Sequence, residues 1–141
     1  MSTLTGSWVE IPASEVRQWV ADFLDSGQMR VLSTISGYQE GERIGIVYHF
    51  MHLDSGSLNL RTFVPLAAPI LPSISPVLPA GLLYEREIQD LLGVTFEGIL
   101  DPRRLILPEE FPAGVYPLRS DYHYHGTEEK ETPGQPGGKA E

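Results

Sequence analysis

The sequence of 141 residues contains no cysteine. Disulfides, cysteine-ligated iron–sulfur clusters, thiolate zinc sites and cysteine nucleophiles are therefore all excluded. Basic residues are also scarce, because ten lysines and arginines stand against nineteen aspartates and glutamates, a formal net charge of −9. Nucleic acids and anionic lipid headgroups are bound through clustered basic side chains, so both are disfavoured as partners.

The sequence also lacks an apolar run that could cross a membrane. Its most apolar stretch, residues 63–83, contains five prolines, and proline at this density breaks a membrane-spanning helix. The first residues show no basic segment followed by an apolar run, as a secretory signal would. We therefore expect a cytosolic protein that, if it meets a membrane, does so through partners.

Local motifs of catalysis and phosphate binding are absent as well. There is no Gly-x-Ser-x-Gly elbow, which would expose a serine nucleophile on a sharp turn. There is also no Gly-x-Gly-x-x-Gly or Gly-x-x-x-x-Gly-Lys-Ser/Thr loop, whose backbone amides would bind phosphate. Nothing local in the sequence indicates an active site.

The apolar spacing that is present predicts an α+β protein. Residues 12–27 repeat apolar side chains every three or four positions, which is typical of an amphipathic helix. A second such helix begins after the prolines and ends at Gly93. Between the helices, β-branched and alternating patterns predict three antiparallel strands joined by glycine-containing turns, in residues 29–36, 44–53 and 58–64.

The length favours one domain, which we place in residues 1–125. After the second helix, proline-broken segments predict an extended C-terminal arm. Residues 126–141 contain no large apolar side chain and are rich in Glu, Gly, Pro and Lys. Such a segment cannot bury enough surface to offset the entropy of ordering it, so we expect a disordered acidic tail there.

The densest group of charges lies on the second predicted helix. Arg86 and Asp90 are one turn apart and could pair with each other. Paired carboxylates on a helix could serve acid–base chemistry, but a solvated helix face is the favoured interpretation. A third alternative is pairing, within the domain or with another protein, to the downstream arginines Arg103, Arg104 and Arg119. Spacing alone does not choose among the three.

Histidines cluster once, in His123 and His125, with Asp121 just before them. In an extended strand alternate side chains point the same way, so both imidazoles could face one metal ion. A docking arm or a solvated chain end is the favoured interpretation. A stand-alone metal-dependent enzyme that uses these three residues remains an alternative.

Three blocks near the C-terminus resemble, in order, the thirty-kilodalton subunit family of respiratory complex I. Residues 84–98 read YEREIQDLLGVTFEG, residues 103–111 read RRLILPEEF, and residues 116–122 read YPLRSDY. The compact length is similar to that of the short members found in energy-converting [NiFe] hydrogenases. The resemblance implies a small mixed, mainly antiparallel sheet with helices on one face.

The resemblance also implies a function. It predicts a cofactor-free structural subunit in the peripheral arm of a membrane-bound, ion-translocating redox complex, on the cytoplasmic side. This subunit would brace a large hydrogenase-like subunit and an iron–sulfur subunit. Those partners are expected to carry iron–sulfur clusters, and nickel–iron in the hydrogenase case. A subunit of an NADH or other donor:quinone oxidoreductase is the alternative within the family.

The same resemblance assigns a role to the charged residues. We expect structural or interfacial ion pairs that hold the second helix and the arm, inside the domain or across a subunit interface. The residues are Glu85, Arg86, Glu87, Asp90, Arg103, Arg104, Arg119 and Asp121.

Overall fold

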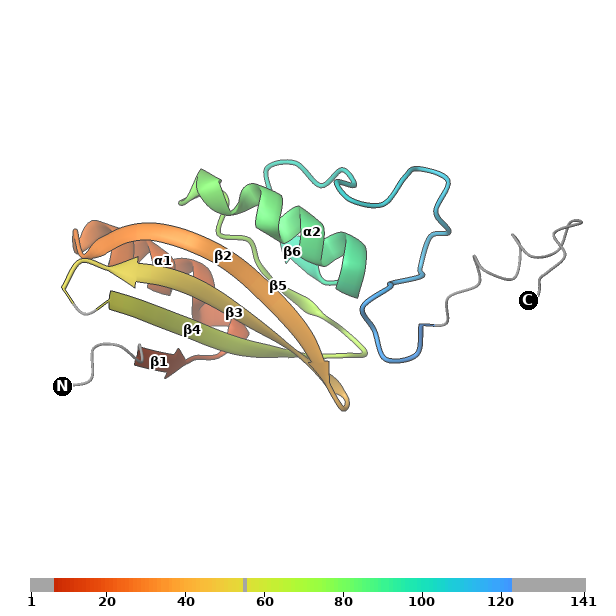
Figure 1. Ribbon diagram of the computed structural model, residues 1–141, viewed down its shortest axis with the longest axis horizontal. Coiled ribbons are helices and arrows are strands. Elements are labelled where there is room, and N and C mark those ends of the chain that lie inside the picture. The colour runs from red at the N-terminus through yellow and green to blue at the C-terminus, as the bar shows by residue number, and fades with distance from the viewer. Residues whose placement is uncertain (1–6, 55, 123–141) are drawn as a thin grey trace, which may run out of the picture.

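The computed structural model describes residues 7–54 and 56–122 (Figure 1). Its main sheet has four strands in the order β1-β4-β3-β2. Consecutive strands β2, β3 and β4 pair antiparallel, and β1 joins the edge at β4 in parallel. These strands are β1 (Ser7–Glu10), β2 (Met29–Glu40), β3 (Arg43–His52) and β4 (Gly56–Pro65).

Two helices and a second, smaller sheet complete the described part of the fold. The helices are α1 (Val16–Asp25) and α2 (Leu82–Leu92), each preceded by a 3₁₀ turn, η2 (Ala13–Glu15) or η3 (Pro79–Gly81). The smaller sheet pairs β5 (Ile70–Pro72) with β6 (Thr95–Glu97) in parallel. The predicted α+β class and the mixed, mainly antiparallel sheet are thus confirmed.

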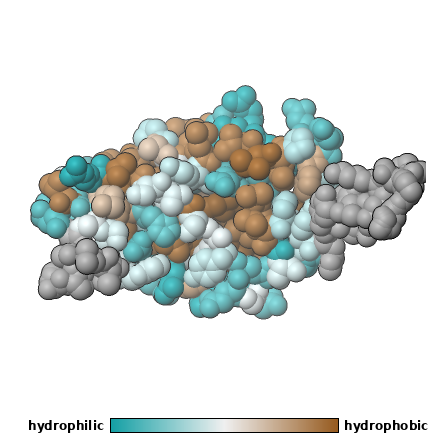
Figure 2. Space-filling view, in the orientation of Figure 1, coloured by the Kyte–Doolittle hydropathy of each residue, from teal (hydrophilic) through white to brown (hydrophobic). Residues whose placement is uncertain are grey.

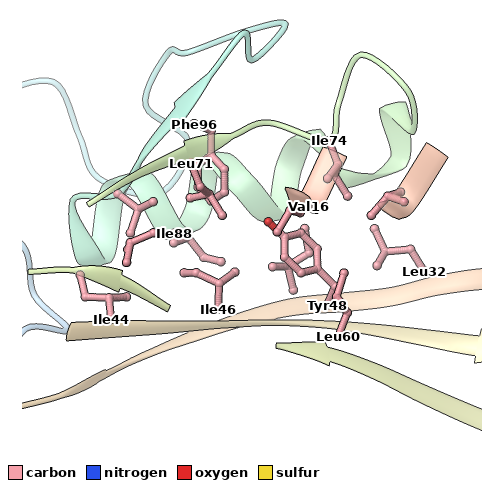
Figure 3. Packing of buried hydrophobic residues seen from close by; sticks show 14 of the residues in the cluster. Val16, Leu32, Ile44, Ile46, Tyr48, Leu60, Leu71, Ile74, Ile88 and Phe96 are labelled. Atoms are coloured by element: carbon pink, nitrogen blue, oxygen red, sulfur yellow. The ribbon is translucent and has the colours of Figure 1, made fainter. Parts of the chain in front are cut away.

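The core lies between the main sheet and the layer that carries the helices (Figure 3). Fully buried side chains from β3, such as Ile44, Ile46 and Tyr48, meet Ile88 from α2 and Phe96 from β6. The helices and β5–β6 therefore cover one face of the sheet, as the resemblance implied.

No helix in the described ranges is long and apolar enough to cross a membrane.

Glycines explain why β2 is longer than predicted. We expected the chain to turn at residues 37–43, but β2 continues through Glu40 and the turn is only Gly41-Glu42. A Cβ on Gly37 would lie 2.7 Å from the Leu92 side chain, and one on Gly45 would lie 2.5 Å from the Tyr38 ring. Gly37 and Gly45 therefore allow close packing inside strands, and of the two glycines in the predicted turn, Gly37 and Gly41, only Gly41 turns the chain, with a left-handed φ of 62°.

The C-terminal arm, residues 98–122, contains no helix or strand. It leaves the end of β6 and returns to the C-terminal end of α2, where the Leu118 amide donates to the carbonyl of Leu91 (2.8 Å). Figure 1 shows it as the cyan-to-blue loop beside α2. Because the arm has no ladder of its own, its backbone polar groups depend on side chains of α2 and on local turns.

Candidate protein interface at the second helix and the arm

Asp90 on α2 holds three successive amides of the arm. Its Oδ2 accepts hydrogen bonds from the backbone N–H groups of Leu105 (2.9 Å), Ile106 (2.6 Å) and Leu107 (3.1 Å). The side chain is almost buried, with 5% exposure. Bonds from amides to a carboxylate are stronger than neutral ones, so this residue determines the local path of the arm.

Arg86, one turn earlier on α2, holds the preceding part of the arm. Its Nε donates to the carbonyl of Arg103 (2.8 Å) and its Nη2 to that of Arg104 (3.0 Å). Its Nη1 also lies 3.4 Å from Oδ2 of Asp101. One planar guanidinium therefore satisfies two carbonyls and one carboxylate, which a lysine could not do.

The arm also stabilises itself locally. Two side-chain bonds from the Arg103 guanidinium, at 2.9 and 2.7 Å, hold the pKa of Asp101 well below its usual range. Arg104 Nη1 donates to the carbonyls of Pro108 (2.6 Å) and Phe111 (2.9 Å). The side chains of Arg103 and Arg104 thus stabilise turns within the arm, and only their backbone carbonyls face α2.

The C-terminal end of α2 is a third anchor. Arg119 Nε donates to the carbonyl of Leu92 (2.8 Å), where the helix dipole favours a positive charge. The same guanidinium stacks on the ring of Tyr116, 4.8 Å from its centroid. Gly93 ends the helix with a left-handed φ of 78°, and the Tyr116 ring occupies the space that a Cβ would need.

Glu85 differs from the other charged residues of α2, because it faces the core and is 0% exposed. Its Oε1 accepts from Ser73 Oγ (2.6 Å) and its Oε2 from the Ile74 amide (2.7 Å). Burial raises the pKa of Glu85 to about 7, although these bonds and the charge of Arg17 oppose the rise. This carboxylate therefore joins α2 to the segment after β5.

With its polar backbone held, the arm leaves apolar side chains exposed to solvent. They are Leu100 (58% exposed), Leu105 (39%), Ile106 (53%) and Leu118 (56%). Figure 2 shows further apolar residues gathered over the middle of one face of the molecule, with hydrophilic ones around them. Exposed apolar side chains whose backbone is held by hydrogen bonds are typical of a surface that contacts another protein.

Comparison with known proteins identifies the family of this chain. Residues 9–128 match the family described as the respiratory-chain NADH dehydrogenase, 30 Kd subunit. This chain belongs to that family. It is thus a subunit of the kind found in complex I-like and membrane-bound hydrogenase complexes.

Two curated relatives and one solved structure illustrate the likeness. The membrane-bound hydrogenase subunit beta of Pyrococcus furiosus is 34% identical over 81% of this chain and 68% of its own length. Formate hydrogenlyase subunit 5 of Escherichia coli K12 is 36% identical over 72% of this chain but only 19% of its own length. A chain of the membrane-bound sulfane sulfur reductase, an archaeal respiratory membrane complex, has the same fold. Its TM-score is 0.75 at 23% identity, over 90% of this chain and 78% of that one.

Within this family fold, the predicted residues fall into two groups. Arg86, Asp90, Arg103, Arg104 and Arg119 come together where α2 meets the arm. Arg86 and Asp90, which spacing allowed to pair with each other, do not pair, because each side chain points to a different part of the arm. Their bonds go mostly to backbone groups, and the ion-pair partner in the arm, Asp101, was not anticipated.

The remaining predicted residues do not join this cluster. Glu85 lies in the core, and sequence spacing could have indicated it, because Glu85, Ile88 and Leu92 share the buried stripe of the helix. Glu87 is half-buried and Asp121 is exposed, and the structure gives neither an ion pair among the described residues.

The histidine site is only partly covered by the structure. His123 and His125 lie outside the described residues, and Asp121 is near their end. Within residues 7–54 and 56–122, no group of three or more acidic or histidine side chains could hold a metal ion. The absence of a bound cofactor therefore stays a prediction for the whole chain.

Proposed function

We propose that this chain is a cofactor-free structural subunit in the peripheral arm of a membrane-bound, ion-translocating redox complex. It braces the large, hydrogenase-like catalytic subunit, next to an iron–sulfur subunit, on the cytoplasmic side of the membrane. The complex is an energy-converting [NiFe] hydrogenase or a related complex I-like enzyme. Electrons pass through iron–sulfur clusters, and nickel–iron where present, on those partners.

The arm carries this proposal. Asp90 and Arg86 of α2 bind the backbone of the arm. Its side chains at Leu100, Ile106 and Leu118 are apolar and exposed to solvent. Ordering an irregular segment costs conformational entropy, and in an isolated domain its exposed leucines return little. A partner that covers these exposed side chains removes them from water, and this burial offsets the entropy cost of ordering the arm.

The relatives support the choice of partner. The matched 72% of this chain covers 19% of formate hydrogenlyase subunit 5, so there a similar domain shares one polypeptide with a much longer remainder. The Pyrococcus relative is itself named as a hydrogenase subunit. We infer that the partner of this protein is a separate chain that corresponds to that remainder. This partner is the large subunit that the arm contacts.

Affinity purification from native membranes, with a tag on this chain, tests the assembly. The variants Leu100→Glu and Leu118→Glu place a charge on the arm, and Leu53→Glu is the control. Leu53 is equally exposed, at 52%, but lies after β3, away from the arm. We expect each arm variant to recover at least tenfold less partner protein, since a buried unpaired charge is costly, and the control to recover the normal amount. Normal recovery by both arm variants would refute the role of the arm.

Mass spectrometry of the co-purifying chains separates the alternatives. A nickel-bearing large subunit supports the hydrogenase assignment. Flavin-bearing and quinone-site chains support an NADH or other donor:quinone oxidoreductase. Metal analysis of the purified chain addresses the third alternative, because a stoichiometric transition metal that is lost in His123→Ala would indicate a metal-dependent enzyme.

A further inference from the structure

Glu85 is a fully buried carboxylate without an ion-pair partner among the described residues. The Ser73 hydroxyl and the Ile74 amide donate to it, and the backbone of Ser75 and the charge of Arg17 also favour its ionised form. An ionised carboxylate in such a place loses its hydration, and these groups compensate only in part. The site is therefore built so that a carboxyl group can change its protonation state near neutral pH.

A chain of hydroxyl groups leads from Glu85 to the arm. Ser73 Oγ lies 2.8 Å from Ser75 Oγ, and either atom can be the donor. Ser75 Oγ in turn accepts from the amide of Leu100, near the start of the arm (3.0 Å). When Glu85 is ionised, both hydroxyl protons point toward it. When Glu85 is protonated, it can donate to Ser73, and Ser73 can donate to Ser75, by rotation of the hydroxyls alone.

Two side chains from other elements face this site, the cationic Arg17 and the phenolic Tyr48. Arg17 on α1 donates from Nε to the carbonyl of Ser73 (2.6 Å), and its charge favours the ionised form of Glu85. Tyr48 on β3 points its hydroxyl from the sheet into the helical layer, where no described group bonds to it (Figure 3). Burial and the charge of Glu85 both raise the pKa of Tyr48, so Tyr48 stays neutral.

We propose that Glu85, Ser73 and Ser75 form a proton-controlled latch that closes the start of the arm onto the segment after β5, which Glu85 joins to α2. Ser75 Oγ can accept from the Leu100 amide in both protonation states, so the control comes from hydration of Glu85: the latch is tighter when Glu85 binds a proton and looser when the proton leaves. If residues 98–100 open, water reaches the carboxylate and stabilises its anion. Opening and deprotonation therefore favour each other, as linkage between two equilibria requires. This inference does not depend on the proposed assembly.

Amide NMR and hydrogen exchange of the full chain between pH 5 and 9 test the latch. We expect the Ile74 and Leu100 signals to shift together, with a common midpoint at about 7. Protection of the Leu100 amide, corrected for the intrinsic exchange rate, should fall about tenfold between pH 6 and 8 if Glu85 regains its ordinary pKa on opening.

Three variants identify the group responsible. Glu85→Gln should abolish both effects, and Glu87→Gln, the same change two positions away on α2, should keep both. Ser75→Ala should leave the Ile74 shift and remove that of Leu100, because it cuts the hydroxyl chain. If Glu85→Gln does not fold, the wild-type and Ser75→Ala titrations still decide. A Leu100 signal that ignores pH near 7, or that titrates unchanged in Ser75→Ala, overturns the proposal.

Discussion

Asp90 and Ile106, sixteen positions apart in the chain, are joined by a hydrogen bond of 2.6 Å from the Ile106 amide to the Asp90 carboxylate. The same oxygen also accepts from Leu105 and Leu107. A regular element, α2, therefore supplies the acceptor that an irregular segment cannot supply for itself. The conformation of the arm is thus a property of α2 as much as of its own sequence.

Asp90→Asn should lower the free energy of unfolding by about 2 kcal/mol, because three bonds to an anion become bonds to a neutral amide oxygen at best. Urea unfolding of the full chain measures this loss, and the amides of residues 105–107 should exchange faster. Asp25→Asn, on an exposed position of α1, is the matched control and should change stability by about 0.5 kcal/mol or less. Equal effects of the two variants would contradict the anchoring role.

Gly93→Ala and Gly27→Ala separate backbone strain from collision. Both glycines have a left-handed φ, 78° and 77°, so alanine is strained at either position by about 1 kcal/mol. A Cβ at Gly27 meets nothing within 4 Å, whereas one at Gly93 would lie 2.5 Å from the Tyr116 ring. We expect Gly93→Ala to cost clearly more in thermal unfolding and to shift the NMR signals of Tyr116. Equal costs would show that Tyr116 moves away freely.

The stability of the whole chain should depend on pH through Glu85. Its pKa is about 7 when folded and 4.5 in a free side chain, so between these values the folded chain keeps a proton that the unfolded chain has lost. The free energy of unfolding should therefore fall as the pH rises from 4.5 to 7, by about 3 kcal/mol at most. Denaturant unfolding at several pH values measures the slope, and Glu85→Gln should flatten it. A wild-type slope that persists in Glu85→Gln would assign the dependence to another group.

Most of the regular structure could be predicted from the sequence, because it depends on local periodicity. The three-stranded meander and both helices follow apolar spacing, and α2 ends at Gly93 as expected. The parallel strand β1 was missed, because four residues carry no clear pattern and its partner β4 lies about fifty positions away. The short β5–β6 pair was missed for the same reason, and Pro72 argued against a strand there.

The site was less predictable than the fold. Its arginines and Asp90 were identified through the resemblance, but the bonds they make go to carbonyls and amides of an irregular segment, which no side-chain pattern reveals. Asp101 was not expected to pair with Arg86, since they belong to different elements. Glu85 belongs to the charged group of the second helix by sequence, yet its position on the buried stripe of α2 indicates the core.

Arg86→Ala should weaken assembly of the complex and leave the cofactor content per large subunit nearly unchanged in whatever complex remains. The guanidinium holds two carbonyls of the arm and contacts Asp101, so its removal frees the backbone that precedes Leu105 and Ile106. Arg86→Lys should give an intermediate loss, because one ammonium cannot reproduce a planar, forked donor. Native gels and co-purification measure assembly, and metal analysis of the recovered complex measures its cofactors.

The control for this experiment is Arg30→Ala, which removes an exposed arginine near the start of β2, at the opposite end of that strand from Gln39, which the arm contacts. Arg30 forms no ion pair among the described residues, so assembly should be normal in that variant. Normal assembly in Arg86→Ala as well would count against the interface. A parallel loss of nickel or iron per large subunit would instead mean that this chain acts on the cofactors of its partner. Selective loss of assembly with intact cofactors is the outcome that separates bracing from chemistry.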